Sequence, residues 1–352
     1  MISKLRLAGA AAAIFVVVPV LLADCGGDNA QAPATTTPTA SAPATTSAAP
    51  SASVAASTPA IRCPSPSAAP VTPASPPKAG CPDMSTLDAL AKLDMSKELK
   101  LDKKLGTQLK DIALATVALD HASAQIDGSM KEACGKLLAD FGCSGDFGDA
   151  PATCHAAENV IDQARANAGP AATLTPRVTP AVCKVPAQAM LDCVHACDPT
   201  FKGKADALKC DGTADATGCD GSWSSAKTSQ GCSIACAATA ADKAQCTPEQ
   251  IAIQVDNATD AKAADALKSA LEKDLHGAMM HEAARGRVQA LAKKNADLLK
   301  ALPKDIDAMS KKNPRLACFD SVMMSNVSGM TRIAVETALS LNVMLTATTK
   351  KK

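Results

Sequence analysis

This sequence of 352 residues has very few aromatic side chains: no tyrosine, one tryptophan and five phenylalanines. Sugar-binding platforms and the surfaces that stack nucleic-acid bases are built from aromatic rings. The composition therefore argues against carbohydrate and nucleic-acid partners.

The sequence also lacks an excess of charge of either sign. It has 36 basic and 35 acidic residues, which give a net charge of +1. Without a positive surface, little counterion release is available to drive binding to nucleic acid or to anionic lipid. We therefore expect no nucleic-acid partner.

Catalytic motifs are missing as well. No G-x-S-x-G, P-loop or G-x-G-x-x-G string occurs in a strand-to-helix context, and the chain has five histidines. The string Ser224–Lys227 (SSAK) matches the S-x-x-K motif of penicillin-recognising enzymes, but the lysine-threonine string that belongs on a distant strand overlaps it. We therefore assign no catalytic residue and no cofactor. The alternative is a hydrolase whose site assembles from residues scattered along the chain.

The chain begins with an export signal. Lys4 and Arg6 precede an apolar run from Leu7 to Leu22, which is too short for a comfortable membrane span but typical of a secretory signal. Residues 1–24 are therefore predicted to be a signal peptide.

Cys25 lies in the string Leu22–Gly27 (LADCGG), which is similar to a bacterial lipobox, where the cysteine is acylated and becomes the new N-terminus. Asp24 departs from that motif, because the residue before the cysteine is usually small and uncharged. The chain has fifteen cysteines, an odd number, and lipidation of Cys25 leaves an even number to pair. We predict a lipid anchor at Cys25, with cleavage elsewhere or an uncleaved anchor as the alternatives.

Residues 25–80 are predicted to form the lipid anchor and a disordered tether. From Asp28 to about Lys78 the chain is mostly Ala, Pro, Thr and Ser without apolar periodicity, so burial would not offset the entropy lost on ordering. Cys63 is the exception in this segment. Its candidate partners are Cys81 and a cysteine of another chain.

The folded body is predicted to cover residues 81–349 and to be cross-linked, because exported proteins fold in an oxidising compartment. Many of the cysteines gather in a Cys-rich central segment, residues 183–246. The C-x3-C motifs Cys193–Cys197 and Cys232–Cys236 each place both sulfurs on one helical face, so they are expected to join two short helices into a hairpin. The cysteines assigned to disulfides, with pairing left open, are Cys81, Cys134, Cys143, Cys154, Cys183, Cys193, Cys197, Cys210, Cys219, Cys232, Cys236, Cys246 and Cys318.

Apolar periodicity predicts helical blocks on both sides of the central segment. Ser85 and Asp88 are expected to open a short helix as a capping box. A long helix follows and ends near Gly142. Its apolar face is predicted to consist of Leu105, Leu109, Ile112, Thr116, Leu119, Ser123, Ile126 and Met130.

The remaining pattern completes an α+β fold that is mainly α-helical, with two helical blocks, a small β-sheet and a disulfide-rich central segment. A proline-bearing edge strand is expected at 173–180, because proline cannot donate to a central ladder. The other expected elements are a helix at 151–168, a helical turn at 190–193, a strand at 250–255, helices within 263–302 and 314–339, and a strand at 341–348.

One motif raises the question of zinc. His195 lies between Cys193 and Cys197, so a zinc site with these three ligands is conceivable. An oxidising compartment favours disulfides over zinc thiolates. We therefore assign no metal to this motif.

Two further patterns fall short of known metal motifs. His276, His281 and Glu282 superficially resemble a metalloprotease helix, but the histidines are five residues apart instead of four. Another string has acids at Asp211, Asp215 and Asp220, but Ala216 and Ser222 occupy the positions where an EF-hand has glycine and glutamate. A loose calcium site remains an alternative.

Several short strings carry a family resemblance. They are Cys81-Pro82, Ala133-Cys134-Gly135, the two C-x3-C motifs, Cys246-Thr247-Pro248 before the 251–255 strand, and Ala317-Cys318. On these strings the chain resembles a group of uncharacterised cysteine-rich lipoproteins typical of myxobacteria, over most of residues 81–349. The resemblance implies this architecture and an envelope location, and it transfers no catalytic residue.

Together these features predict an exported lipoprotein of the bacterial cell envelope, at the outer membrane or the cell surface. The body would be a non-enzymatic structural or binding module on a tether, with the membrane and an envelope protein as partners. The alternatives are the envelope hydrolase and a calcium-dependent adhesion or matrix protein centred on Asp211, Asp215 and Asp220.

Overall fold

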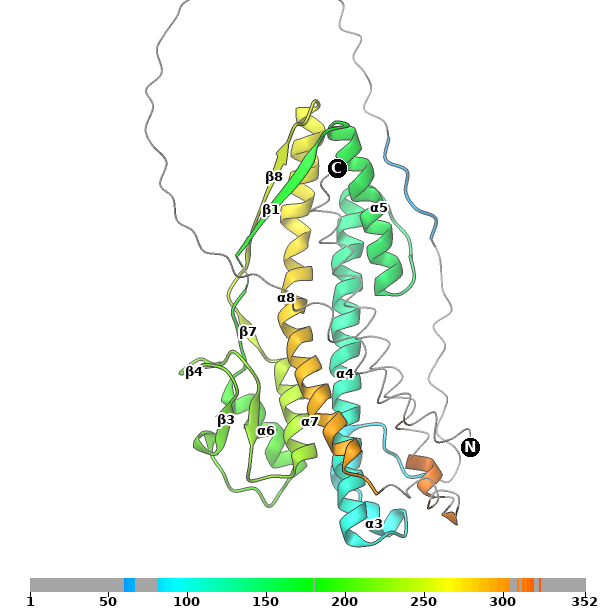
Figure 1. Ribbon diagram of the computed structural model, residues 1–352, viewed down its shortest axis with the longest axis vertical. Helices are drawn as coiled ribbons and strands as arrows, with labels where there is room; N and C mark the ends of the chain where they lie inside the picture. Colours follow the sequence, from blue (N-terminus) through cyan, green and yellow to red (C-terminus); the bar gives the residue numbers. More distant parts are fainter. Residues whose placement is uncertain are drawn as a thin grey trace, which may run out of the picture.

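The computed structural model describes residues 60–66, 81–179, 181–303, 309, 312–313, 315–319 and 323, and of residues 276–283 the backbone alone. Two long antiparallel helices lie side by side through the molecule, α4 (Lys103–Asp140) and α8 (Ala261–Lys300) (Figure 1). The other elements are short helices, two-stranded antiparallel sheets and a disulfide-rich central segment. The predicted class, mainly helical α+β, is confirmed.

Helix α4 forms where the apolar periodicity predicts it. Asp102 begins the helix by accepting a hydrogen bond from the backbone N–H of Leu105, at 3.0 Å. Gly142 follows its C-terminal end with a φ of +80°, a conformation that favours glycine. The predicted apolar face is buried at Leu105, Leu109, Ile112, Thr116, Leu119, Ser123, Ile126 and Met130. Through its buried residues, α4 packs against α5, α7 and α8.

The first short helix begins one residue later than the predicted capping box. Thr86 is the N-cap of α2 (Leu87–Lys92), and its hydroxyl accepts from the backbone N–H of Ala89. Ser85 donates its own N–H and O–H to the carboxylate of Asp83, so its hydroxyl is turned away from the helix. A further helical turn, α3 (Met95–Glu98), leads into α4.

The helix predicted at 151–168 is confirmed as α5 (Ala150–Ala168), and it packs along the C-terminal half of α4. Asp149 caps its start and Gly169 follows its last residue. Together α4, α5 and α8 enclose one apolar core, which includes Leu137, Val160, Ile161, Leu267 and Leu271.

A segment of the predicted tether lies against this helical end of the molecule. Residues 60–66 run beside α5, and Cys63 forms a disulfide with Cys143 (Figure 1). The side-chain amide of Gln163 accepts from the backbone N–H of Arg62 at 2.8 Å and donates to its carbonyl at 3.0 Å. The interpretation of Cys81 as the partner of Cys63 is wrong, because Cys81 pairs with Cys318.

Strands β1 (Thr173–Thr179) and β8 (Gln250–Asp256) form an antiparallel ribbon along α8 (Figure 1). Pro176 lies opposite Ile253 in the register. The N–H of Ile253 points away from β1 and donates to the carboxylate of Glu272 on α8. Pro176 and Ile253 are therefore a non-hydrogen-bonded pair, in which the proline needs no N–H. The predicted edge strand with proline is confirmed.

The strands do not join into one sheet. Three further two-stranded sheets lie within residues 183–246. They pair β2 (Cys183–Lys184) with β7 (Gln245–Cys246), β3 (Leu208–Cys210) with β6 (Trp223–Ser225), and β4 (Ala214–Asp215) with β5 (Gly218–Cys219). The predicted strand at 341–348 and most of the predicted helix at 314–339 lie outside the described residues, although Leu316 to Phe319 are helical.

Between α4 and the central segment lies a second apolar core. It includes Leu109, Ile112, Met190, Val194 and Ile234. None of the helices in the described part of the chain combines the length and the apolar composition needed to cross a bilayer.

Candidate functional site: the disulfide hub and the groove beside Trp223

We call residues 183–246 the hub. Its framework is a helical hairpin of α6 (Ala187–Cys197) and α7 (Gln230–Ala241). Two disulfides, Cys193–Cys236 and Cys197–Cys232, connect the helices in antiparallel order. The hairpin predicted from the two C-x3-C motifs is confirmed.

All thirteen cysteines assigned to disulfides are paired, and Cys63 completes the set. Within the hub, Cys183–Cys246 joins β2 to β7 and Cys210–Cys219 closes a nine-residue loop. Outside it, Cys134–Cys154 links α4 to α5. The pairs are Cys63–Cys143, Cys81–Cys318, Cys134–Cys154, Cys183–Cys246, Cys193–Cys236, Cys197–Cys232 and Cys210–Cys219.

This pairing removes the thiolates that a zinc site at His195 requires. The sulfurs of Cys197, Cys232 and Cys236 lie close enough together to share a metal, but each is bonded to another sulfur. The His195 ring packs edge-on against Phe201, with the ring centroids 5.5 Å apart. His195 therefore belongs to an aromatic contact.

The two Cys-Asp-Gly strings of the hub form a reciprocal turn. Asp211 accepts from the backbone N–H of Ser222, and Asp220 accepts from that of Thr213. The glycine after each aspartate lies against the other aspartate, since a Cβ on Gly212 or Gly221 would meet the opposite carboxylate within 2.4 Å. The disulfide Cys210–Cys219 closes the same pair of turns. These aspartates and glycines have a structural role in holding the two turns together.

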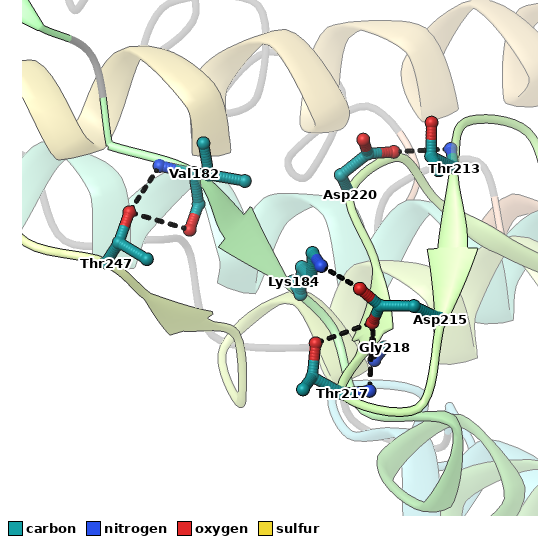
Figure 2. Close-up of polar contacts among 8 residues, drawn as sticks. All are labelled: Val182, Lys184, Thr213, Asp215, Thr217, Gly218, Asp220 and Thr247. Atoms are coloured by element: carbon teal, nitrogen blue, oxygen red, sulfur yellow. Dashed lines mark hydrogen bonds and ion pairs between the residues drawn. The ribbon is translucent and has the colours of Figure 1, made fainter.

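The third aspartate of the calcium hypothesis faces elsewhere. Figure 2 shows Asp215 bonded to Lys184 on one side and to Thr217 and Gly218 on the other, while Asp220 points to Thr213. The hydrogen bond from Lys184, followed by those from Thr217, lowers the pKa of Asp215. Among the described residues, Asp211, Asp215 and Asp220 do not gather into one group at ligand distance. The arrangement does not favour the calcium alternative.

Helix α8 fixes the hub from outside through two basic side chains that the sequence reading missed. Arg287 donates to the backbone carbonyls of Cys183 and Asp220, and burial lowers the pKa of its guanidinium. Lys294 forms an ion pair with Asp211 at 3.2 Å. The two residues are seven apart, so they lie on one face of α8. Nothing in the sequence connects them to the hub residues that they contact, which lie 67 or more positions earlier in the chain.

A second connection joins α7 to α4. Ser229 caps α7 by accepting from the N–H of Cys232, and it donates its hydroxyl to Asp111 on α4 at 2.5 Å. Burial raises the pKa of Asp111. Gly231 lies so close to α4 that an added Cβ would be 2.2 Å from the Cα of Asp111. The serine therefore acts as a helix cap.

The S-x-x-K string has no catalytic geometry. Ser224 donates its hydroxyl to the backbone carbonyl of Lys209 instead of contacting Lys227. Ser225 accepts from the backbone N–H of Lys227. His276 and His281 lie on α8, and their side chains and that of Glu282 lie outside the described residues.

Trp223, the single tryptophan, sits at the centre of the hub. Its ring N–H donates to the carbonyl of Val185 at 2.7 Å, and the residue is 8% exposed. Beside it is a groove of about 370 Å³ between β6, α7 and α8. The groove is lined by Trp223, Ser224, Ser225, Ala226, Thr228, Gln230, Ser233, Ile234, Leu291 and Lys294.

A second hollow of about 420 Å³ lies between β8 and α8, with Arg177, Gln254, Asp265, Lys268 and Glu272 at its edge. Lys268 and Glu272 are near each other, and Glu272 holds the N–H of Ile253. Of its polar groups, Glu272 thus has a structural contact with the ribbon.

Comparison with known proteins finds no matching family model, no matching curated protein and no matching solved structure.

Proposed function

We propose that this chain is an exported, lipid-anchored protein of the bacterial cell envelope, whose disulfide-linked body is a non-enzymatic structural or binding module. One observation carries the proposal. The disulfides use every cysteine except Cys25, the residue predicted to be acylated, which lies outside the described residues. Such a set of disulfides needs an oxidising compartment, which an exported chain reaches.

The attachment of the N-terminal segment supports display of the hub away from the membrane. Of the described residues, 60–66 are the nearest in sequence to Cys25, and Cys63 among them is bonded to Cys143 just beyond the C-terminal end of α4. The hub contacts α4 near Asp111, about 40 Å away at 1.5 Å per residue. The 34 residues from Gly26 to Pro59 can span at most about 120 Å.

The polar contacts of the hub support a non-enzymatic role. Ser224, which precedes Lys227 in the S-x-x-K string, donates its hydroxyl to a backbone carbonyl. Ser229, which contacts Asp111, caps helix α7. The reciprocal turns use Asp211 and Asp220 for backbone contacts. These side chains stabilise the shape of the hub.

The anchor is tested by replacing Cys25. In Cys25→Ser we expect the protein to move from the membrane fraction to the soluble fraction, and the wild type to carry acyl mass on its N-terminal cysteine. Cys63→Ser is the matched control, because it removes a cysteine of the same segment but leaves Cys25. If the wild type lacked acyl mass and fractionated like Cys25→Ser, the proposed anchor would be wrong.

A further inference from the structure

We propose that the groove beside Trp223 binds a small amphipathic carboxylate, with its apolar part on Trp223, Ile234 and Leu291 and its carboxylate at Lys294. The groove has about 370 Å³, the size range of small-molecule sites. The inference rests on the binding role proposed for the body, and it does not depend on the lipid anchor.

The apolar floor is formed by side chains that are held in place. Trp223, Ile234 and Leu291 are 8%, 3% and 2% exposed, and they come from β6, α7 and α8. The Trp223 ring is fixed by its bond to Val185, and α7 by its two disulfides to α6. A floor that does not rearrange on binding lowers the entropy cost of association.

Charge selects the ligand class. Among the described residues that line the groove, Lys294 carries the one formal charge. Its ammonium has three N–H donors, and the ion pair with Asp211 orients it without using all of them. An anion at this position shares the Lys294 ammonium with Asp211, which lies outside the groove lining, and meets no carboxylate of the lining itself.

Two of the groove's hydroxyl groups, those of Ser224 and Thr228, donate elsewhere and cannot hold an anion. Ser224 already donates its O–H to the carbonyl of Lys209, and Thr228 donates to the carboxylate of Asp198 at 3.2 Å. A carboxylate accepts hydrogen bonds and has none to donate. Recognition of a carboxylate should therefore depend mainly on the charge of Lys294. The exposed amide of Gln230 and the buried hydroxyls of Ser225 and Ser233, which accept hydrogen bonds from backbone N–H groups, are further donors.

Trp223 provides a single energy donor beside the groove, because it is the one tryptophan in the chain. The experiment uses the full chain with Cys25→Ser, which retains every disulfide cysteine. Energy transfer from Trp223 to dansylglycine, which has an aromatic body and a carboxylate, is titrated beside dansylamide, which lacks the carboxylate. We expect saturable transfer to dansylglycine, tighter than to dansylamide, and competition by hexanoate.

Three variants separate the contributions. Lys294→Gln should weaken dansylglycine binding about tenfold and leave dansylamide unchanged, because a charge-assisted contact is lost. Lys293→Gln is the matched control: this exposed neighbour does not line the groove, and no change is expected. Ala226→Leu should weaken binding of both probes, because it fills the exposed edge of the groove while keeping the charge.

The proposal would be overturned by absence of saturable transfer, by equal affinity for the two probes, or by equal effects of Lys294→Gln and Lys293→Gln. Circular dichroism and a melting curve confirm that each variant is folded. Failure of this test leaves the anchor result untouched, since the anchor is measured by fractionation and acyl mass.

Discussion

The two halves of α4 lie in regions that are stabilised by different means. Around the N-terminal half lies the hub, whose strands are two or three residues long and which contains four of the seven disulfides. Around the C-terminal half, α5, α8 and the seven-residue strands of the ribbon enclose an apolar core. Strands as short as those of the hub are not stable by pairing alone. Four disulfides thus reinforce the short strands and the helical hairpin of the hub, which also share an apolar core with α4, whereas longer elements and their buried core contribute more at the helical end.

Loss of the hairpin disulfides tests this contrast most strongly. Replacing Cys193, Cys236, Cys197 and Cys232 by serine removes both bridges without leaving a free thiol. Each bridge closes a separation of 35 or 43 residues, so we expect the free energy of unfolding to fall by about 3–4 kcal/mol per bridge. Hydrogen exchange should show α6, α7 and the hub strands opening while α4, α5 and the ribbon stay protected.

The control is the double replacement of Cys134 and Cys154, which removes the bridge between α4 and α5. Both cysteines are fully buried in the apolar core of the helical end. We expect this variant to lose stability but to unfold in one transition, because burial still couples the helices. Selective opening of the helical end in the hairpin variant would contradict the contrast.

The contact between the hub and the N-terminal half of α4 is tested next by Gly231→Ala. The added methyl would overlap the backbone of Asp111, so α7 must move away from α4, at a cost of about 1–3 kcal/mol. Gly135→Ala on α4 is the matched control: nothing lies within 4 Å of its added Cβ, and alanine favours a helix by about 0.5–1 kcal/mol. Urea denaturation should show a lower free energy of unfolding for Gly231→Ala and a higher one for Gly135→Ala. Equal effects would show that the α4–α7 approach is not tight.

The periodic parts of the fold were predictable from the sequence. The stripe from Leu105 to Met130 repeats at helical spacing, and the structure buries all of it. The C-x3-C motifs predicted the hairpin, because two sulfurs on one face of each helix leave antiparallel pairing as a simple arrangement. Both predictions rest on the spacing of residues within one helix, which the sequence shows directly.

Contacts between distant residues were not predictable in the same way. Cys63 lies in an Ala/Pro/Thr/Ser segment, and its bond to Cys143 spans 80 residues. Lys294 and Arg287 reach the hub because of how α8 packs, and a lysine on a helix is ordinarily a solvated charge. The groove beside Trp223 depends on three elements coming together, so spacing along the chain gives no sign of it.

The smallest predicted effect concerns Glu249, which lies between β7 of the hub and β8 of the ribbon. It is 4% exposed, and burial raises its pKa from 4.5 to about 7. Between these values the folded protein holds a proton that unfolding releases, so the free energy of unfolding should fall as pH rises through this window. Glu249→Gln cannot ionise, so we expect a flatter pH profile and a gain on the order of 1 kcal/mol at pH 8, because solvent screening reduces the effect of the shift. Glu132→Gln is the control, because that side chain is 67% exposed and its loss should leave the slope unchanged. If urea denaturation from pH 4 to 8 gave the same slope for Glu249→Gln and the wild type, another group would account for any pH dependence between hub and ribbon.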